Sequence, residues 1–67
     1  MKKATKGIAE ELREMKVGDV VAFPDEIYKA STIRATPSQM RLERKQGWNW
    51  ATRSDFKNGC TIVTRIS

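Results

Sequence analysis

The 67-residue chain contains no histidine and a single cysteine, Cys60. Without histidine, the usual ligand of catalytic zinc and the usual proton shuttle are both missing. One cysteine cannot form an internal disulfide, and with no histidine to act as its base we expect Cys60 to be a small buried apolar residue, not a nucleophile. These absences predict a protein that is not an enzyme and that carries no metal ion or other cofactor.

Long apolar segments are missing as well. No stretch approaches the roughly 20 apolar residues that a membrane-spanning helix needs, and the N-terminus lacks the apolar part of a signal peptide. We therefore expect a cytoplasmic protein with no membrane partner. A folded chain of about 60 residues buries only about 60% of the surface that its unfolded form exposes. Residues 1–67 are accordingly expected to form one small domain with a small core.

Acidic residues are scarce in the second part of the chain. Residues 1–26 hold five Lys and Arg against six Asp and Glu, whereas residues 27–67 hold eight against two. The formal net charge of +5 therefore originates in the C-terminal part. Clustered Lys and Arg release counterions when they neutralise phosphates, so this asymmetry predicts a nucleic-acid partner. A solvated surface that only increases solubility is the alternative explanation.

The first part of the chain is predicted to form a helix followed by a strand. Residues 1–6 are polar and are expected to be disordered. After them, Ile8, Leu12 and Met15 recur at helical spacing, so one stripe of a helix can face a core. The short apolar run at 20–23 predicts a buried strand that Pro24 ends. The acidic residues of the helix are expected on its outer face: Glu10, Glu11 and Glu14.

Residues 25–46 have a helical pattern that Pro37 interrupts. The stretch Thr36-Pro37-Ser38-Gln39 has the features of a helix start, with a capping threonine, proline at the first helical position and glutamine at the third. This predicts two helices, at about 26–35 and 37–46. The alternative is one helix from about Ser31 or Thr32 that carries Pro37 in its second turn. In either case Gly47 is expected to end the helix in a left-handed conformation.

An alternating pattern predicts a β-hairpin over residues 48–66, with its turn at Asn58-Gly59. A two-residue turn would pair Lys57 with Cys60 and would separate the apolar residues of the two strands. A three-residue turn would pair Phe56 with Cys60 and would bring the apolar residues to one face. Because a slip of one residue moves every side chain to the other face, the hydrophobic pattern favours the three-residue turn.

This register assigns the aromatic residues to the core. Trp48, Trp50 and Phe56 would share the inner face with Cys60 and Ile62, where a small domain needs their area. Stacking of the two tryptophans on nucleobases is the alternative. The outer face would present four polar residues: Arg53, Asp55, Thr61 and Arg65.

The expected fold class is α+β, in a single small domain. Its element order is helix, strand, broken helix, strand, strand, and the strands are expected to form a three-stranded antiparallel sheet. This is the element order of a small winged helix, in which the hairpin at 48–66 would be the wing. A shared fold does not determine function, which depends on the residues of the site.

The basic residues of the second part divide between the central helix and the hairpin. At about 100° per residue, Arg34, Arg41 and Lys45 fall on one helical face. Arg and Lys bind phosphates, and Arg can also pair with guanine edges in a groove. We therefore predict a nucleic-acid-binding site, with duplex DNA as the expected partner. It comprises Arg34, Ser38, Arg41, Arg44, Lys45, Arg53, Lys57 and Arg65.

Several short segments form a recognisable pattern over about residues 17–66, in which a strand ending in Phe-Pro precedes a helix with Ile-Arg near its start. The segments are Val20 to Pro24, Ile33-Arg34, Gly47, Thr52-Arg53 and Val63 to Ile66. In this pattern the chain resembles small uncharacterised proteins of bacteria, their phages and conjugative elements. The resemblance implies a mobile-element setting and leaves the biochemical activity open.

Two functions from different classes follow from these observations. The first is a DNA-binding regulator or accessory factor of a mobile element. The second is a small protein-binding adaptor or inhibitor, which would dock through a sheet edge or an apolar patch. The second function predicts that at least one of Tyr28, Trp48, Trp50 and Phe56 is exposed. We expect a monomer, or a weak dimer formed through an open sheet edge.

Overall fold

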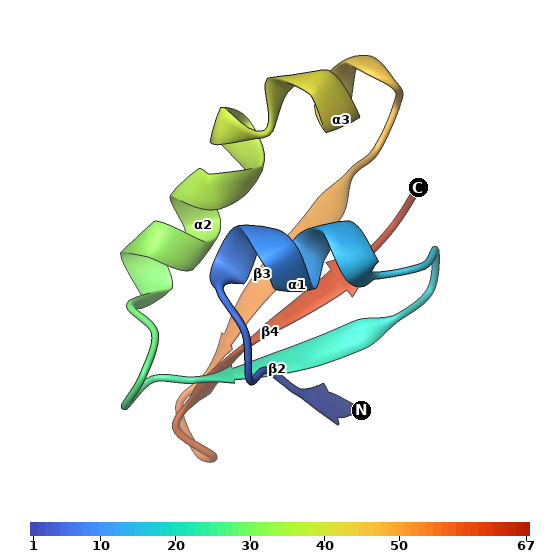
Figure 1. Ribbon diagram of the computed structural model, residues 1–67. Helices are drawn as coiled ribbons and strands as arrows, with labels where there is room; N and C mark the ends of the chain where they lie inside the picture. Colours follow the sequence, from blue (N-terminus) through green and yellow to red (C-terminus); the bar gives the residue numbers. More distant parts are fainter.

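The computed structural model describes residues 1–67 as one four-stranded sheet and three helices, of which the first two lie against one face of the sheet and the third continues from the second (Figure 1). The strands are β1 (Lys2–Lys3), β2 (Val20–Pro24), β3 (Trp50–Asp55) and β4 (Cys60–Arg65), and the helices are α1 (Ile8–Glu14), α2 (Ala30–Gln39) and α3 (Arg41–Lys45). The α+β class is confirmed. The sheet, however, has four strands in the order β1-β2-β4-β3, with β1 parallel to β2 and the other pairs antiparallel.

The hydrophobic core lies between the helices and one face of the sheet. Leu12 of α1 and Ile33 of α2 are fully buried, and α1 crosses in front of the strands in Figure 1. Side chains alternate between the two faces of a strand, and the core residues of β2, β3 and β4 all lie on the face toward these helices. These strand residues are Val21, Phe23, Trp50 and Val63.

No helix covers the other face of the sheet, which we call the open face. A row of paired residues crosses it from β1 to β3: Lys3, Ala22, Ile62 and Arg53. Ile62 is only 2% exposed although it lies outside the core cluster. Cys60 is half-buried on this same face. Its expected place on the inner face is therefore wrong.

Residues 1–6, for which we expected disorder, contribute a strand to the sheet. Ala4 is buried, and its N–H donates to the carbonyl oxygen of Ala22 at 2.8 Å. The Tyr28 hydroxyl donates to the carbonyl oxygen of Lys6 at 2.6 Å. Because β1 has only two residues, no alternating pattern marks it in the sequence.

The break between the two central helices falls at Met40, and the predicted break at 36–37 is wrong. Pro37 lies inside α2, and Thr36 is not a cap, since its hydroxyl donates to the carbonyl oxygen of Thr32 at 2.7 Å. Met40 leaves the helical region with φ −89° and ψ 66°, and its side chain is buried. Burial of Met40 in the core accompanies this break.

The end of α3 agrees with the prediction. Gly47 has a φ of +94°, and its N–H donates to the carbonyl oxygen of Arg44 at 3.0 Å. Glycine adopts this left-handed conformation without the steric cost that other residues pay. None of the three helices is long and apolar enough to cross a membrane.

The β3–β4 hairpin forms with a register that differs by one residue from the prediction. Asp55 pairs with Cys60, so residues 56–59 form a four-residue loop, and Trp50 pairs with Arg65. The side chains of β4 are therefore on the opposite faces from those expected. Thr61, expected on the outer face, is 0% exposed, and its hydroxyl donates to the Asp25 carboxylate at 3.1 Å.

Candidate functional site

The basic residues after residue 26 take part in no ion pair. The structure contains three ion pairs, and each takes its cation from the first part of the chain: Lys2–Glu11, Lys6–Glu14 and Arg13–Glu43. None of the eight Lys and Arg residues of 27–67 is paired. No Asp or Glu carboxylate of the protein therefore lies within ion-pair distance of these cations.

Two of the predicted site segments lie in α2 and α3. Arg34 of α2 reaches toward β3, where its Nη2 donates to the Ser54 hydroxyl at 2.7 Å. Ser38 is exposed near the end of α2. The break at Met40 separates these residues from the three exposed cations of α3, so they do not share one continuous helical face. The cations of α3 are Arg41, Arg44 and Lys45.

The remaining predicted residues lie along or near β3. This strand is at the edge of the sheet, and α2 packs beside it. Arg53 is exposed on the open face and Lys57 is exposed in the loop, while α3 precedes the start of the strand (Figure 1). Six cations outside the ion pairs thus belong to β3 itself or to the segments next to it: α2 beside the strand, α3 before its start and the loop 56–59 after its end. We call them the β3-edge surface: Arg34, Arg41, Arg44, Lys45, Arg53 and Lys57.

Arg65 does not lie on this surface. Its guanidinium is stacked over the Trp48 ring at 3.9 Å from the centroid, and Nη1 donates to the carbonyl oxygen of Met15 at 2.6 Å. Nε donates to the carbonyl oxygen of Ser67 at 2.8 Å. Arg65 is therefore on the helix-covered face of the sheet, not on the expected outer face, because the register is shifted by one residue.

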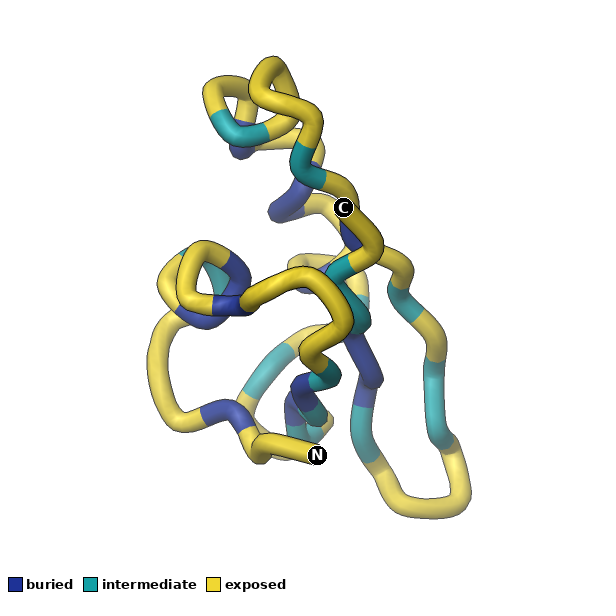
Figure 2. The backbone as a smooth tube through the Cα atoms, turned by 90° about the vertical axis from the view of Figure 1, so that its right-hand side faces the viewer, coloured by how far each residue is buried: buried dark blue, intermediate teal, exposed yellow.

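Phe56 is the most exposed aromatic side chain of the protein, at 88%. It begins the loop 56–59, which lies at the far end of the hairpin and is exposed in Figure 2. The Asn58 side chain donates to the Asp55 carboxylate at 2.8 Å and keeps the pKa of Asp55 below its ordinary value. The prediction that Phe56 faces the core is wrong, because the loop contains one residue more than expected.

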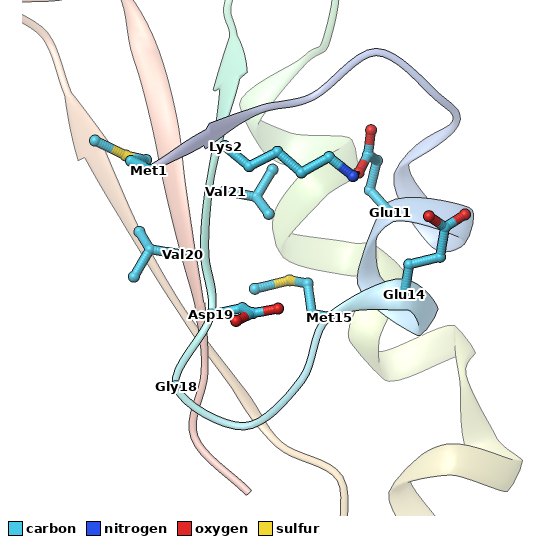
Figure 3. Close-up of a pocket in the computed structure, with 9 residues that line it drawn as sticks. All are labelled: Met1, Lys2, Glu11, Glu14, Met15, Gly18, Asp19, Val20 and Val21. Atoms are coloured by element: carbon cyan, nitrogen blue, oxygen red, sulfur yellow. The ribbon is translucent and has the colours of Figure 1, made fainter.

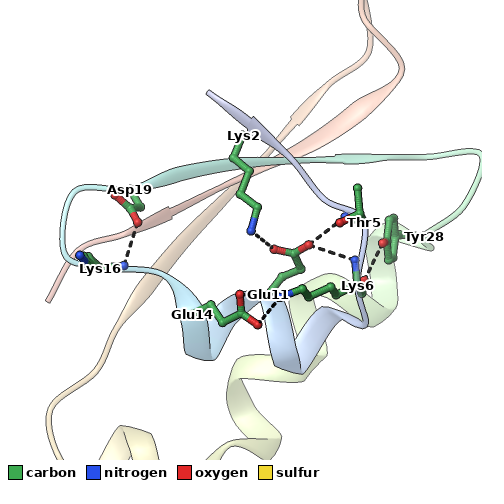
Figure 4. Close-up of polar contacts among 8 residues, drawn as sticks. All are labelled: Lys2, Thr5, Lys6, Glu11, Glu14, Lys16, Asp19 and Tyr28. Atoms are coloured by element: carbon green, nitrogen blue, oxygen red, sulfur yellow. Dashed lines mark hydrogen bonds and ion pairs between the residues drawn. The ribbon is translucent and has the colours of Figure 1, made fainter.

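A polar cluster around Glu11 ties β1 to α1 (Figure 4). The side chain of Glu11 is 0% exposed, and its Oε2 accepts hydrogen bonds from the backbone N–H groups of Thr5 at 2.8 Å and Lys6 at 3.0 Å. The Lys2 ammonium lies 3.0 Å from Oε1, which has no donor in hydrogen-bonding geometry. The expected position of Glu11 on the outer face is therefore wrong.

The surroundings of Glu11 favour its ionised form. Burial raises the pKa of Glu11, but the Thr5 N–H, the Lys2 ammonium and the Lys6 N–H outweigh it, so the pKa lies below its ordinary value of 4.5. On the exposed side of the cluster, the Glu14 carboxylate raises the pKa of Lys6. The ionised carboxylate of Glu11 thus binds the backbone N–H groups of the N-terminal residues and the Lys2 ammonium.

The largest cavity, about 440 Å³, lies beside this cluster (Figure 3). Lys2, Glu11, Glu14 and Asp19 supply its charged groups. A second cavity of about 300 Å³ lies on the open face and contains one residue of each charge, Lys3 and Glu26. Neither cavity has the uniformly positive lining that a phosphate needs, and no three His, Cys, Asp or Glu side chains converge to hold a metal ion.

The β3-edge surface is therefore the candidate functional site, because its charges are exposed and unpaired and because it collects residues from α2, α3 and the hairpin. All six of its cations belong to the site predicted from the sequence, which also contained Ser38 and Arg65; the exposed position of Phe56 was not predicted. Comparison of the chain with protein-family models, with curated proteins and with solved structures finds no match.

Proposed function

We propose that the protein is a small non-enzymatic module that binds nucleic acid, with duplex DNA as its partner. One observation carries this proposal: the acidic residues neutralise only cations of the first part, so the β3-edge surface is left with six unpaired positive charges. Binding of such a surface to phosphates is driven by the release of condensed counterions. A surface of one charge sign also attracts a polyanion over several ångströms.

The dimensions of the surface suit a short stretch of duplex. A six-residue strand such as β3 is about 20 Å long, which corresponds to about six base pairs at 3.4 Å each. Cations lie near both ends of the strand, in α3 and in the loop 56–59. The hydrogen bond from Arg34 to Ser54 fixes one further cation beside the strand. These positions allow several phosphates to be contacted at once.

The element order adds support by analogy. After β1, the order α1–β2–α2–α3–β3–β4 is that of a winged helix. However, α3 has five residues, which is fewer than two helical turns, so it can present few side chains to base edges in a major groove. We therefore assign phosphate contacts, not base readout, to α3. A role in a mobile element stays a prediction of the resemblance alone.

Reversing three charges of the surface tests the proposal. We expect the variant R34E/R41E/K45E to lose at least 100-fold in affinity for duplex DNA while it stays folded, because all three side chains are exposed. For the wild type, the logarithm of the affinity should fall linearly with the logarithm of the salt concentration, with a slope of about −0.9 per phosphate contacted. Fluorescence anisotropy with a labelled duplex at several salt concentrations measures both effects.

A charge-matched control separates the surface from the net charge. R41E/K45E and K3E/K16E each change the net charge by the same amount, and all four residues are exposed. Only the first pair belongs to the β3-edge surface. We expect R41E/K45E to weaken binding strongly and K3E/K16E to weaken it little. Equal losses in the two variants would contradict the assignment of the site, and a wild type that binds no nucleic acid would contradict the function.

A small protein-binding adaptor or inhibitor is the second candidate, and one observation favours it. That function predicts an exposed aromatic residue, and Phe56 is 88% exposed, whereas Trp50 is buried and Trp48 is half-buried. Salt dependence distinguishes the two candidates. Docking driven by apolar contact keeps or gains affinity as salt rises, whereas binding to phosphates loses it steeply.

A further inference from the structure

We infer that the tip of the β3–β4 hairpin is a base-stacking site, in which the ring of Phe56 packs on the face of an unpaired or unstacked nucleobase. The inference rests on the proposed function and adds the kind of nucleic acid to it: one that exposes base faces. Such faces occur in single strands and at distorted steps of a duplex. Proteins use exposed aromatic rings in both situations.

Phe56 is exposed in a loop whose conformation is fixed by hydrogen bonds. The Asp55 carboxylate accepts hydrogen bonds from the side chain of Asn58 at 2.8 Å and from its backbone N–H at 3.4 Å. Gly59 takes the left-handed conformation, with φ +64°, and its carbonyl oxygen accepts from the Asp25 N–H at 2.9 Å. These bonds fix the loop at both of its ends, and they hold Phe56 outside the core.

The charges near the ring favour a polyanionic partner. Lys57 follows Phe56 in the loop and Arg53 lies in β3 before it, and neither is in an ion pair. Three acids lie near the loop. The Asp55 carboxylate accepts from Asn58 and the Asp25 carboxylate accepts from Thr61, while Glu26 lines the cavity on the open face together with Lys3. An aromatic ring that two cations flank in the sequence can stack on a base while the cations contact the neighbouring phosphates. An apolar pocket of a protein would match the ring but would leave both cations without a partner.

The other aromatic residues cannot serve this purpose. Trp50 is 7% exposed, and the ring of Trp48 is covered on one face by the Arg65 guanidinium. Tyr28 donates its hydroxyl to Lys6 and packs edge-to-face against Phe23, with ring centroids 5.2 Å apart. Only Phe56 has a free ring next to the cations of the β3-edge surface. The loop 56–59 is therefore the one place where stacking and phosphate contact can combine.

The test measures the affinity of the wild type, F56A, F56L and F56W for three DNA probes at one salt concentration. The probes are a single-stranded oligonucleotide, the matching intact duplex and the same duplex with a central mismatch, each with 2-aminopurine as a fluorescent base. Loss of one stacked aromatic should lower affinity between about 5-fold and 150-fold. We expect this loss for F56A and F56L on the single strand or the mismatch, with restoration by F56W. The change in 2-aminopurine fluorescence that the wild type causes on binding should be absent with F56A, because the base no longer stacks on a ring.

The two arms of the experiment separate the sources of the base. A loss confined to the single strand assigns the site to single-stranded nucleic acid, and a loss on the mismatched duplex assigns it to a distorted duplex step. An affinity of F56A within twofold of the wild type on every probe would overturn the inference. The exposed ring of Phe56 would then favour binding to a protein. The proposed function would survive that result if R34E/R41E/K45E still lost binding. Because Phe56 is exposed, F56A should unfold at the same urea concentration as the wild type.

Discussion

Replacing Glu11 by alanine is expected to lower the free energy of unfolding by about 2 to 3 kcal/mol. The loss arises because the backbone N–H groups of Thr5 and Lys6 lose their acceptor, and because the Lys2 ammonium loses its counterion. A domain of this length has a total stability of only about 3 to 10 kcal/mol, so the effect should be large. Urea denaturation followed by tryptophan fluorescence measures it, and the midpoint should fall by about 2 M.

The contribution of Glu11 should also depend on pH. The pKa of Glu11 is lower in the folded protein than its ordinary value of 4.5. The ionised form is thus the one that the fold stabilises, and its contribution is complete above about pH 5 and is lost as pH falls through the folded pKa. The gap in unfolding free energy between the wild type and E11Q should therefore be larger at pH 7 than at pH 3. A gap that does not change with pH would contradict this assignment.

The neighbouring Glu10 provides the control for both experiments. It lies on the same helix and is exposed, so E10A should change the stability by less than about 0.5 kcal/mol. Amide hydrogen exchange adds a local measurement. In E11A, the amides of Ala4, Thr5 and Lys6 should exchange faster than those of β4 if β1 detaches first. Equal stability of E11A and E10A would show that Glu11 does not hold the N-terminal residues.

Local rules were sufficient for the parts of the fold that depend on near neighbours. The spacing of Ile8 and Leu12 predicted α1, and the apolar run before Pro24 predicted β2. Gly47 was predicted at a left-handed position, and its φ is positive. Each of these features is determined by a few consecutive residues, which is why a single sequence contains the necessary information.

The features around Glu11 depend on contacts between α1 and the non-helical segment that precedes it. Its carboxylate is buried only because Thr5 and Lys6 direct their N–H groups to it, and the strand that precedes them has two residues. In the sequence, Glu11 stands beside Glu10 with the same side chain and a similar environment. The burial of one glutamate and the exposure of the other result from tertiary packing, and the helical pattern does not distinguish them.

The hairpin register was wrong because the prediction assumed that the core would receive the most apolar residues. Ile62 is buried on the open face, whereas the inner face accommodates Arg65, whose charge is placed over the Trp48 ring. Long basic side chains can cover aromatic surface in this way, so alternation of apolar residues alone did not decide the register. The same error placed Phe56 in the core, although its side chain is exposed, and left Arg65 among the candidate contacts.

Replacing Arg65 by alanine should therefore destabilise the protein by about 2 to 3 kcal/mol. The substitution leaves the Met15 carbonyl oxygen without its donor at 2.6 Å and removes the cation 3.9 Å above the Trp48 ring. R65K should lose less, because lysine keeps the positive charge but lacks the fork that contacts both Met15 and Ser67. Urea denaturation measures the loss, and the fluorescence of Trp48 should shift to longer wavelength in R65A as its ring gains solvent.

Arg53 is the matched comparison, because both arginines were expected on the same outer face and the structure separates them. Arg53 is exposed on the open face without an ion pair, so R53A should change stability by less than about 0.5 kcal/mol. If the β3-edge surface binds DNA, R53A should lower the affinity and reduce the salt slope by about 1, whereas R65A, measured where it is still folded, should bind as the wild type does. If R65A is instead stable and defective in binding, the result would contradict the register of the structure and support the one that the hydrophobic pattern predicted.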